Sequence, residues 1–319
     1  MDILITGVAG FIGAALARSL LSKNHHVVGV DNLNDYYDVG LKHSRLSTLA
    51  DSNSFEFFQC DIADENNFAA IFKNRRFDCV VNLAAQAGVR YSIENPRAYA
   101  RSNLSGFLNV LEVCREHKVP KLLYASSSSV YGISDRTPFR TEENTDHPIS
   151  FYAATKKANE VMAHSYSHLY GLQTIGLRFF TVYGPWGRPD MALFKFTKAI
   201  LSGAPIDVYN EGDLSRDFTY IDDIVESIDG VISSSDRQAH AIYNVGNGNP
   251  VQLMQFIRAI EHATGRTALL NYMPMQAGDV PATWADTESL FKVTGYRPKT
   301  SVEEGVAMFV RWFREYYKV

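Results

Sequence analysis

The glycine-rich turn near the N-terminus limits the possible folds more than any other feature of this sequence. Gly7, Gly10 and Gly13 follow the apolar run Ile3 to Thr6 and open a segment with helical spacing, Phe11 to Leu21. Glycines let the backbone approach a pyrophosphate, and the N–H groups and positive end of a helix attract it. The spacing Gly-x-x-Gly-x-x-Gly differs from Gly-x-Gly-x-x-Gly, and three glycines could also serve a tight strand-to-helix connection alone.

Short apolar runs alternate with helical patterns through the first half of the chain. The predicted strands are Ile3 to Thr6, His26 to Val30, Phe55 to Gln59, Cys79 to Leu83 and Lys121 to Ala125. The predicted helices are Phe11 to Leu21, Glu65 to Phe72, Ala98 to Glu116 and Phe151 to Tyr170. This alternation predicts an α/β fold with a doubly wound parallel Rossmann sheet.

The alternation becomes irregular after Tyr183, where prolines separate short elements. We expect residues 1–183 to form mainly a nucleotide-binding Rossmann domain. Residues 184–319 should form mainly a smaller substrate-binding α/β region, and the length of 319 residues suits two such lobes. Because no flexible linker separates the two parts, chain segments are expected to cross between them.

Composition argues against several classes of partner. The formal net charge of −4 gives no general attraction for nucleic acid or an anionic membrane, and no apolar run reaches membrane-spanning length. Cys60, Cys79 and Cys114 are far apart and do not form a zinc or redox motif with the histidines. We therefore expect a cytoplasmic protein that binds no metal, nucleic acid or membrane.

Residues at the ends of the predicted strands favour NAD as the cofactor. Asp31 ends the second strand, where a carboxylate can bind the adenosine ribose, and no arginine follows at once to receive the 2′-phosphate of NADP. Asp61 also lies at a strand end, although it could instead cap the helix that begins at Glu65. The expected cofactor contacts are Gly7, Gly10, Phe11, Ile12, Gly13, Asp31, Asn32, Asp61, Ile62, Leu83, Ala84, Ala85, Asn103, Tyr152 and Lys156.

The sequence Tyr-Ala-Ala-Thr-Lys indicates a catalytic pair. Tyr152 and Lys156 are four residues apart on a predicted helix, so they share one face. A lysine ammonium near a phenol should lower the tyrosine pKa and prepare it as a general base, although this spacing is also common in surface neighbours. Ser127 follows the fifth strand, where it could orient a sugar hydroxyl or relay its proton.

These motifs resemble the extended short-chain dehydrogenase/reductase family, within the NAD-dependent epimerases and dehydratases. Longer segments look specifically like UDP-glucuronate 4-epimerases, and the similarity covers nearly the whole chain. The segments that carry it are Asp31 to Tyr37, Leu83 to Arg90, Tyr124 to Gly132, Tyr152 to Lys156, Arg178 to Pro185 and Arg188 to Ala192. The resemblance implies that NAD transiently oxidises C4 of UDP-glucuronate and that UDP-galacturonate is formed.

The resemblance also assigns roles to individual residues. Ser127, Tyr152 and Lys156 match the catalytic hydroxyl, base and lysine of the family. The implied substrate contacts are Ser128, Ser129 and Thr181 for the sugar carboxylate, Arg90, Arg188 and Arg216 for the diphosphate or carboxylate, and Asp279 for the nucleotide ribose. Guanidinium groups match oxyanions in geometry, and Arg216 is the strongest of the three arginine candidates.

Other functions stay open at this stage. The chain could be another UDP-sugar epimerase, a decarboxylase, a dehydratase or a non-catalytic NAD-binding regulator. Related decarboxylases commonly have an acidic residue at the position of Ser129, and dehydratases have another at Ser128, which disfavours both reactions here. Gln276 stands where UDP-galactose 4-epimerases usually have arginine. The helices Ala98 to Glu116 and Phe151 to Tyr170 are expected to form a homodimer interface, unless they pack only within the chain.

Overall fold

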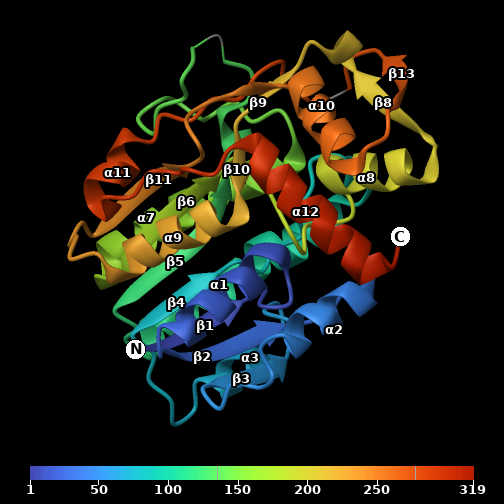
Figure 1. Cartoon of the computed structure of the whole chain (residues 1–319). Helices are drawn as coiled ribbons and strands as arrows, with labels where there is room; N and C mark the ends of the chain where they lie inside the picture. Colours follow the sequence, from blue (N-terminus) through green and yellow to red (C-terminus); the bar gives the residue numbers. More distant parts are fainter. Residues whose placement is uncertain (135, 277) are drawn as a thin grey trace.

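A seven-stranded parallel sheet forms the centre of the protein (Figure 1). The computed structural model describes residues 1–134, 136–276 and 278–319. In spatial order the strands are β11 (His240–Val245), β6 (Gln173–Phe179), β5 (Lys121–Ser127), β4 (Cys79–Asn82), β1 (Asp2–Thr6), β2 (His26–Asp31) and β3 (Phe55–Gln59). The order reverses between β4 and β1, and ligands bind at such a switch point beyond the carboxyl ends of the strands.

Helices cover both faces of this sheet because the side chains of each strand alternate between two hydrophobic cores. Ile3 and Ile5 belong to one core and Leu4 belongs to the other. The first core lies against α1 (Phe11–Ser22) and α9 (Ile221–Ser233). The second lies against α3 (Glu65–Ile71), α6 (Gly106–Glu116) and α7 (Phe151–Tyr170). The doubly wound Rossmann sheet predicted from the sequence is therefore confirmed.

The C-terminal region is built from short strand pairs and three longer helices. The helices are α8 (Ala192–Ser202), α10 (Leu253–Thr264) and α12 (Val302–Tyr317). The strand pairs are β7 (Thr181–Tyr183) with β10 (Phe218–Tyr220), β8 (Pro205–Tyr209) with β13 (Leu269–Met273), and β9 (Ser215–Arg216) with β12 (Val251–Gln252). The smaller α11 (Glu288–Thr294) packs beside α9. Since β11 and α9 join the large sheet, late segments return to the first lobe, and the division at residue 183 stays a prediction.

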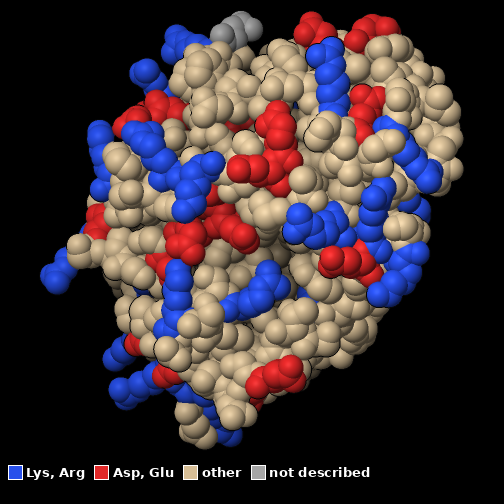
Figure 2. All heavy atoms as spheres, viewed as in Figure 1, with Lys and Arg blue, Asp and Glu red and all other residues tan. Residues whose placement is uncertain are grey.

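The face shown in Figure 2 mixes basic and acidic side chains. Ion pairs join elements on this side of the sheet, such as the one between Lys23 Nζ, after α1, and Asp229 of α9 at 2.7 Å. Within the described residues, no helix is long and apolar enough to cross a membrane.

Two features of the first lobe differ from the helices that the sequence predicts. The helix α2 (Val39–Ser47) has no counterpart among them, because the side chains it buries include Lys42 and Arg45, which do not form an apolar stripe. The single predicted helix from Ala98 to Glu116 is instead α5 (Pro96–Tyr99), a π-helical turn η1 (Ala100–Ser105) and α6. A short helix, α4 (Tyr91–Glu94), precedes α5.

Candidate active site

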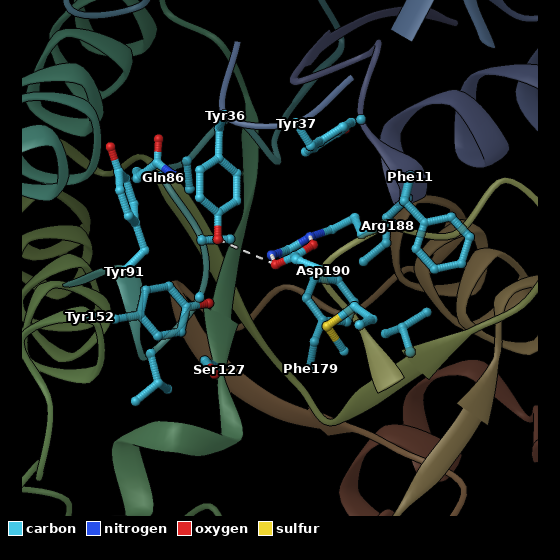
Figure 3. Close-up of a pocket in the computed structure, with 18 of the residues that line it drawn as sticks. Phe11, Tyr36, Tyr37, Gln86, Tyr91, Ser127, Tyr152, Phe179, Arg188 and Asp190 are labelled. Carbon is cyan, nitrogen blue, oxygen red and sulfur yellow. Dashed lines mark hydrogen bonds and ion pairs between the residues drawn. The ribbon is translucent and has the colours of Figure 1, made fainter. Parts of the chain in front are cut away.

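One cavity of about 980 Å³ extends from the carboxyl ends of the large sheet's strands into the C-terminal region. It is lined by aromatic, hydroxyl and charged side chains from both parts of the chain, some of which are drawn in Figure 3. The cavity brings together the residues predicted from the sequence: Gly7, Gly10, Phe11, Ile12, Gly13, Asp31, Asn32, Asp61, Ile62, Leu83, Ala84, Ala85, Arg90, Ser127, Ser128, Ser129, Tyr152, Lys156, Thr181, Arg188, Arg216 and Asp279.

Asn103 is the exception, and its expected direct contact with the cofactor stays a prediction. Its side chain is buried and does not line the cavity. The amide oxygen accepts from Gln86 N at 2.8 Å, and the amide nitrogen donates to Gln86 O and Thr155 Oγ1, both at 3.0 Å. Asn103 therefore connects the loop after β4 to α7, next to Lys156.

The glycine turn leaves no room for side chains. Gly7 has a φ of +72°, and a Cβ on it would lie 2.7 Å from Ala84 N. A Cβ on Gly13 would lie 2.2 Å from Gly7 O. Gly10 is the N-cap of α1 and has no side chain to cap the helix, so the first-turn N–H groups are available to a phosphate. The turn thus needs its glycines for its own packing and also offers a helix end to a dinucleotide.

Asp31, the last residue of β2, and Lys42, on α2, place an acidic and a basic side chain at the cavity wall. Asp31 accepts from Ala9 N at 3.1 Å and Leu33 N at 2.9 Å, and burial raises the pKa of its carboxyl. Lys42 Nζ donates to Asn34 O at 2.6 Å, and burial lowers the pKa of this lysine. Both line the cavity, so a ribose hydroxyl could find an acceptor and a donor here. Sequence reasoning does not identify Lys42, because this residue lies on α2, which apolar spacing does not predict.

Asp61 does not cap the helix that follows it, so that alternative is wrong. The N-cap of α3 is Asp64, whose side chain accepts from Asn67 N. Asp61 Oδ1 instead accepts from Ala63 N at 2.9 Å, and Oδ2 pairs with Arg101 at 3.1 Å. This places the Asp61 carboxylate at the cavity wall beyond β3.

Tyr152 and Lys156 project from the first turns of α7 into the cavity. The helix begins at Phe151 because the Ser150 side chain accepts from Ala153 N and caps it. Lys156 Nζ donates to Ala125 O at 2.9 Å and lies 6.0 Å from the centre of the Tyr152 ring. Burial lowers the pKa of Lys156 to about 8.

The pKa of Tyr152 is raised, which corrects the expectation that Lys156 would lower it. Burial is the main cause, and it is only partly offset by the hydrogen bond with Ser127 and the positive charge of Arg188. Lys156 directs its ammonium to a backbone carbonyl in this state rather than to the phenol. Tyr152 is thus a neutral phenol in the protein alone, and any further stabilisation of phenolate must come when the site is filled.

Ser127, Ser128 and Ser129 form a tight turn where β5 ends. Ser127 is the N-cap of the short 3₁₀ helix η2 (Ser128–Tyr131), and its Oγ accepts from Ser129 N at 3.1 Å. Figure 3 shows Ser127 near the Tyr152 ring. Thr181, at the start of β7, lines the same cavity. We refer to Ser127–Ser129 as the serine turn, which presents several hydroxyl groups at the cavity wall.

Arg188 is held by a carboxylate that sequence reasoning missed. Its Nε donates to Asp190 Oδ1 at 3.0 Å and its Nη2 to Oδ2 at 2.5 Å. Tyr36 OH also donates to Asp190, at 3.3 Å, and Figure 3 shows the three side chains together. Burial alone would raise the pKa of Asp190, but the contact with Arg188 lowers it. The acidic residue two positions after the arginine was the available sequence signal.

The other two arginines, Arg90 and Arg216, contact residues of the C-terminal region. Arg216, on β9, donates to Asp279 Oδ1 at 2.6 Å and to Pro281 O at 3.1 Å. The guanidinium of Arg90 lies 5.2 Å from the centre of the Tyr209 ring. Arg90, Tyr209, Arg216 and Asp279 line the cavity, so they add charged and aromatic groups to its wall.

Acidic and thiol side chains do not gather into a metal centre in the part of the chain that the structure describes. Among residues 1–134, 136–276 and 278–319, no group of three or more His, Cys, Asp or Glu could hold a metal ion. The cysteines Cys60, Cys79 and Cys114 are free.

Comparison with known proteins agrees with this geometry. The chain is 48% identical over 335 residues to a probable UDP-glucuronate 4-epimerase of Rhizobium meliloti (strain 1021), which covers 100% of this chain and 98% of that protein. It is 44% identical over 334 residues to UDP-glucuronate 4-epimerase 2 of Arabidopsis thaliana, covering 100% of this chain and 77% of the relative.

A solved structure of similar fold contains two ligands. The crystal structure of UDP-glucuronic acid 4-epimerase from Bacillus cereus, in complex with UDP-glucuronic acid and NAD, has a TM-score of 0.94 and 31% sequence identity, covering 99% of this chain and 100% of that one. The model of the "NAD dependent epimerase/dehydratase family" matches residues 3–246. With its glycine turn, its Tyr152–Lys156 pair and these similarities, the chain belongs to the NAD dependent epimerase/dehydratase family.

Proposed function

We propose that this protein is an NAD-dependent UDP-glucuronate 4-epimerase, which converts UDP-glucuronate to UDP-galacturonate. The observation that carries the proposal is the content of one cavity. The glycine turn, Tyr152 and Ser127, the hydroxyl groups of Ser128, Ser129 and Thr181, and Arg216 all line this cavity. The relatives named as UDP-glucuronate 4-epimerases support the choice of substrate.

The residues present fit NAD. The glycine turn and the N-terminus of α1 would hold the pyrophosphate, and Asp31 would accept from the adenosine ribose. When bound, NAD supplies the acceptor, and later the donor, of a hydride at the sugar carbon.

Tyr152 moves the proton in this mechanism. Its phenolate oxygen removes the proton of the C4 hydroxyl, and the phenol returns a proton when the ketone is reduced on its opposite face. Because the pKa of Tyr152 is raised in the protein alone, the positive charge of Arg188 and the Ser127 hydroxyl are the groups of this chain that favour phenolate. Ser127 orients the reacting hydroxyl.

The site must also keep the substrate carboxylate. Oxidation at C4 gives a β-keto acid, which can lose carbon dioxide, so the carboxylate has to be held while the ketone turns. Ser128, Ser129 and Thr181 present neutral hydroxyl donors at the cavity wall. Such donors can hold a carboxylate in more than one orientation, whereas Arg216 and Asp279 suit the diphosphate and the nucleotide ribose.

Product analysis tests the proposal. Purified protein incubated with UDP-glucuronate should yield UDP-galacturonate, identified by NMR. Exclusive release of a UDP-pentose would identify a decarboxylase and overturn the assignment. Bound NAD without turnover of any of several UDP-sugars would instead identify a non-catalytic NAD-binding protein.

We also propose that two copies of the chain associate through α6 and α7. Apolar side chains are exposed on these helices: Leu108 is 42%, Val161 is 58% and Leu169 is 64% exposed. Covering them against the same helices of a second copy would remove this apolar area from water. Light scattering after size-exclusion chromatography should give the mass of a dimer, and a monomer at micromolar concentration would reject the proposal.

A further inference from the structure

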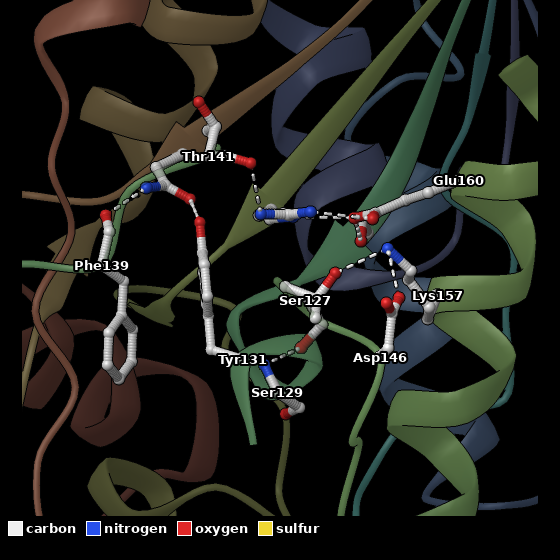
Figure 4. A network of polar contacts seen from close by, with 12 residues as sticks. Ser127, Ser129, Tyr131, Phe139, Thr141, Asp146, Lys157 and Glu160 are labelled. Carbon is white, nitrogen blue, oxygen red and sulfur yellow. Dashed lines mark hydrogen bonds and ion pairs between the residues drawn. The ribbon is translucent and has the colours of Figure 1, made fainter. Parts of the chain in front are cut away.

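A fully buried ion pair joins α7 to β6 behind the serine turn. Arg178 Nε lies 2.8 Å from Glu160 Oε1, and Nη2 lies 2.9 Å from Oε2. Each side chain is only 2% exposed. The free-energy cost of removing two charges from water can exceed the attraction between them, so a buried ion pair is weak evidence for stability. Its role can instead be to hold the groups around it in one arrangement. Figure 4 shows Glu160 within a larger set of polar contacts.

The ion pair holds the first end of the serine turn through Glu160. Ser126 Oγ donates to Glu160 Oε1 at 2.6 Å, and Ser126 directly precedes Ser127. Glu160 lies four residues after Lys156 and eight after Tyr152, so these three share one face of α7. The carboxylate therefore joins the end of β5 to the helix that carries the catalytic base.

Arg178 contacts the chain on the other side of the serine turn, two residues after Ser129. Its guanidinium carbon lies 4.8 Å from the centre of the ring of Tyr131, the last residue of η2. Tyr131 OH also donates to Asn244 Oδ1 at 2.7 Å, while Arg178 Nη1 donates to Thr141 O at 3.3 Å. The residues that flank the serine turn, Ser126 before it and Tyr131 after it, thus contact the two halves of one ion pair.

We propose that Glu160 and Arg178 are positioning residues that place the serine turn against Tyr152 and the sugar carboxylate. The inference rests on the proposed function, because it assigns the turn to substrate. If the ion pair served only the stability of the fold, weakening its contacts would change the affinity for every ligand by a similar factor. If it positions the turn, the loss should concern the sugar carboxylate and leave the nucleotide end unchanged.

The variant Ser126→Ala tests this, because it removes one bond between Glu160 and the turn and keeps the ion pair. In a Tyr152→Phe background, which prevents turnover, calorimetric titration should show UDP-glucuronate binding about three- to tenfold weaker, as expected for one lost hydrogen bond. Binding of UDP, which has no carboxylate, should change less than about twofold. Equal weakening of both ligands, or of neither, would overturn the proposal.

Ser167→Ala is the matched control. Ser167 is also a buried serine, and its Oγ donates to Ala239 O at 2.7 Å, but it lies near the opposite end of α7. It should lower the melting temperature about as much as Ser126→Ala while leaving both affinities unchanged; the same selective loss in both variants would also contradict the proposal.

A second variant, Arg178→Lys, keeps the charge but cannot contact Glu160, Thr141 and the Tyr131 ring together. If this variant folds, it should weaken the binding of UDP-glucuronate more than Ser126→Ala does. If the wild-type chain does not epimerise UDP-glucuronate and the Tyr152→Phe protein does not bind it, the proposed function fails, and the inference fails with it. If the wild type is active but Ser126→Ala behaves like Ser167→Ala, only the inference fails.

Discussion

Replacing Lys156 by methionine should stabilise the NAD-free protein at neutral pH. Lys156 is 3% exposed, and burial lowers its pKa from 10.5 to about 8. At about 1.36 kcal/mol for each pKa unit, keeping the ammonium charged in the folded protein costs about 3 kcal/mol. The lost hydrogen bond to Ala125 O offsets about 1 kcal/mol of this. The expected net gain in the free energy of unfolding is about 2 kcal/mol, since methionine fills similar space.

The pH dependence identifies the cause. Folded Lys156 loses its proton near a pH of about 8, whereas the unfolded value is 10.5. Between these values the unfolded chain binds more protons, so wild-type stability rises with pH relative to the methionine variant. The advantage of the variant should be complete below about pH 8 and absent above about pH 10.5. All other titrating groups are common to both proteins and cancel in the comparison.

Urea unfolding of both proteins near pH 7 and near pH 10 measures the difference. Lys157→Met is the control, because the neighbouring Lys157 donates to Thr145 Oγ1 at 2.7 Å and lies near Asp146, with 26% of its side chain exposed. That variant should bring no gain. A Lys156→Met protein that is less stable than wild type near pH 7, or an advantage that does not change with pH, would refute the reasoning.

Three further predictions concern the site. Tyr152→Phe should lower turnover of UDP-glucuronate by about 10²- to 10⁴-fold and leave NAD bound, as judged by absorbance of the gel-filtered protein; turnover near the wild-type rate would exclude Tyr152 as the base. Gly13→Ala should abolish NAD retention, because its Cβ would lie 2.2 Å from Gly7 O; normal retention would show that the turn can move aside. Arg216→Lys should weaken UDP about tenfold in calorimetry, through loss of the planar fork, and unchanged affinity would remove Arg216 from the nucleotide site.

The local sequence determined the elements that carry the site. The first five strands in chain order and the helix α7 lie where apolar spacing predicts them, although β5 continues past the predicted end at Ala125 to Ser127. These elements could be predicted because apolar periodicity and helix capping depend only on residues that are close in the chain. Ser150 caps α7, and the spacing of Tyr152 and Lys156 then puts both on one face.

Only the tertiary structure decided which partners the polar residues find. Asn103 binds Gln86 and Thr155 rather than facing the cavity, and Arg188 meets both Asp190 and the distant Tyr36. The same holds for the pKa of Tyr152, because burial depends on everything packed around it. Periodicity along the chain specifies which face a side chain takes, whereas desolvation and pairing depend on groups that only folding brings near.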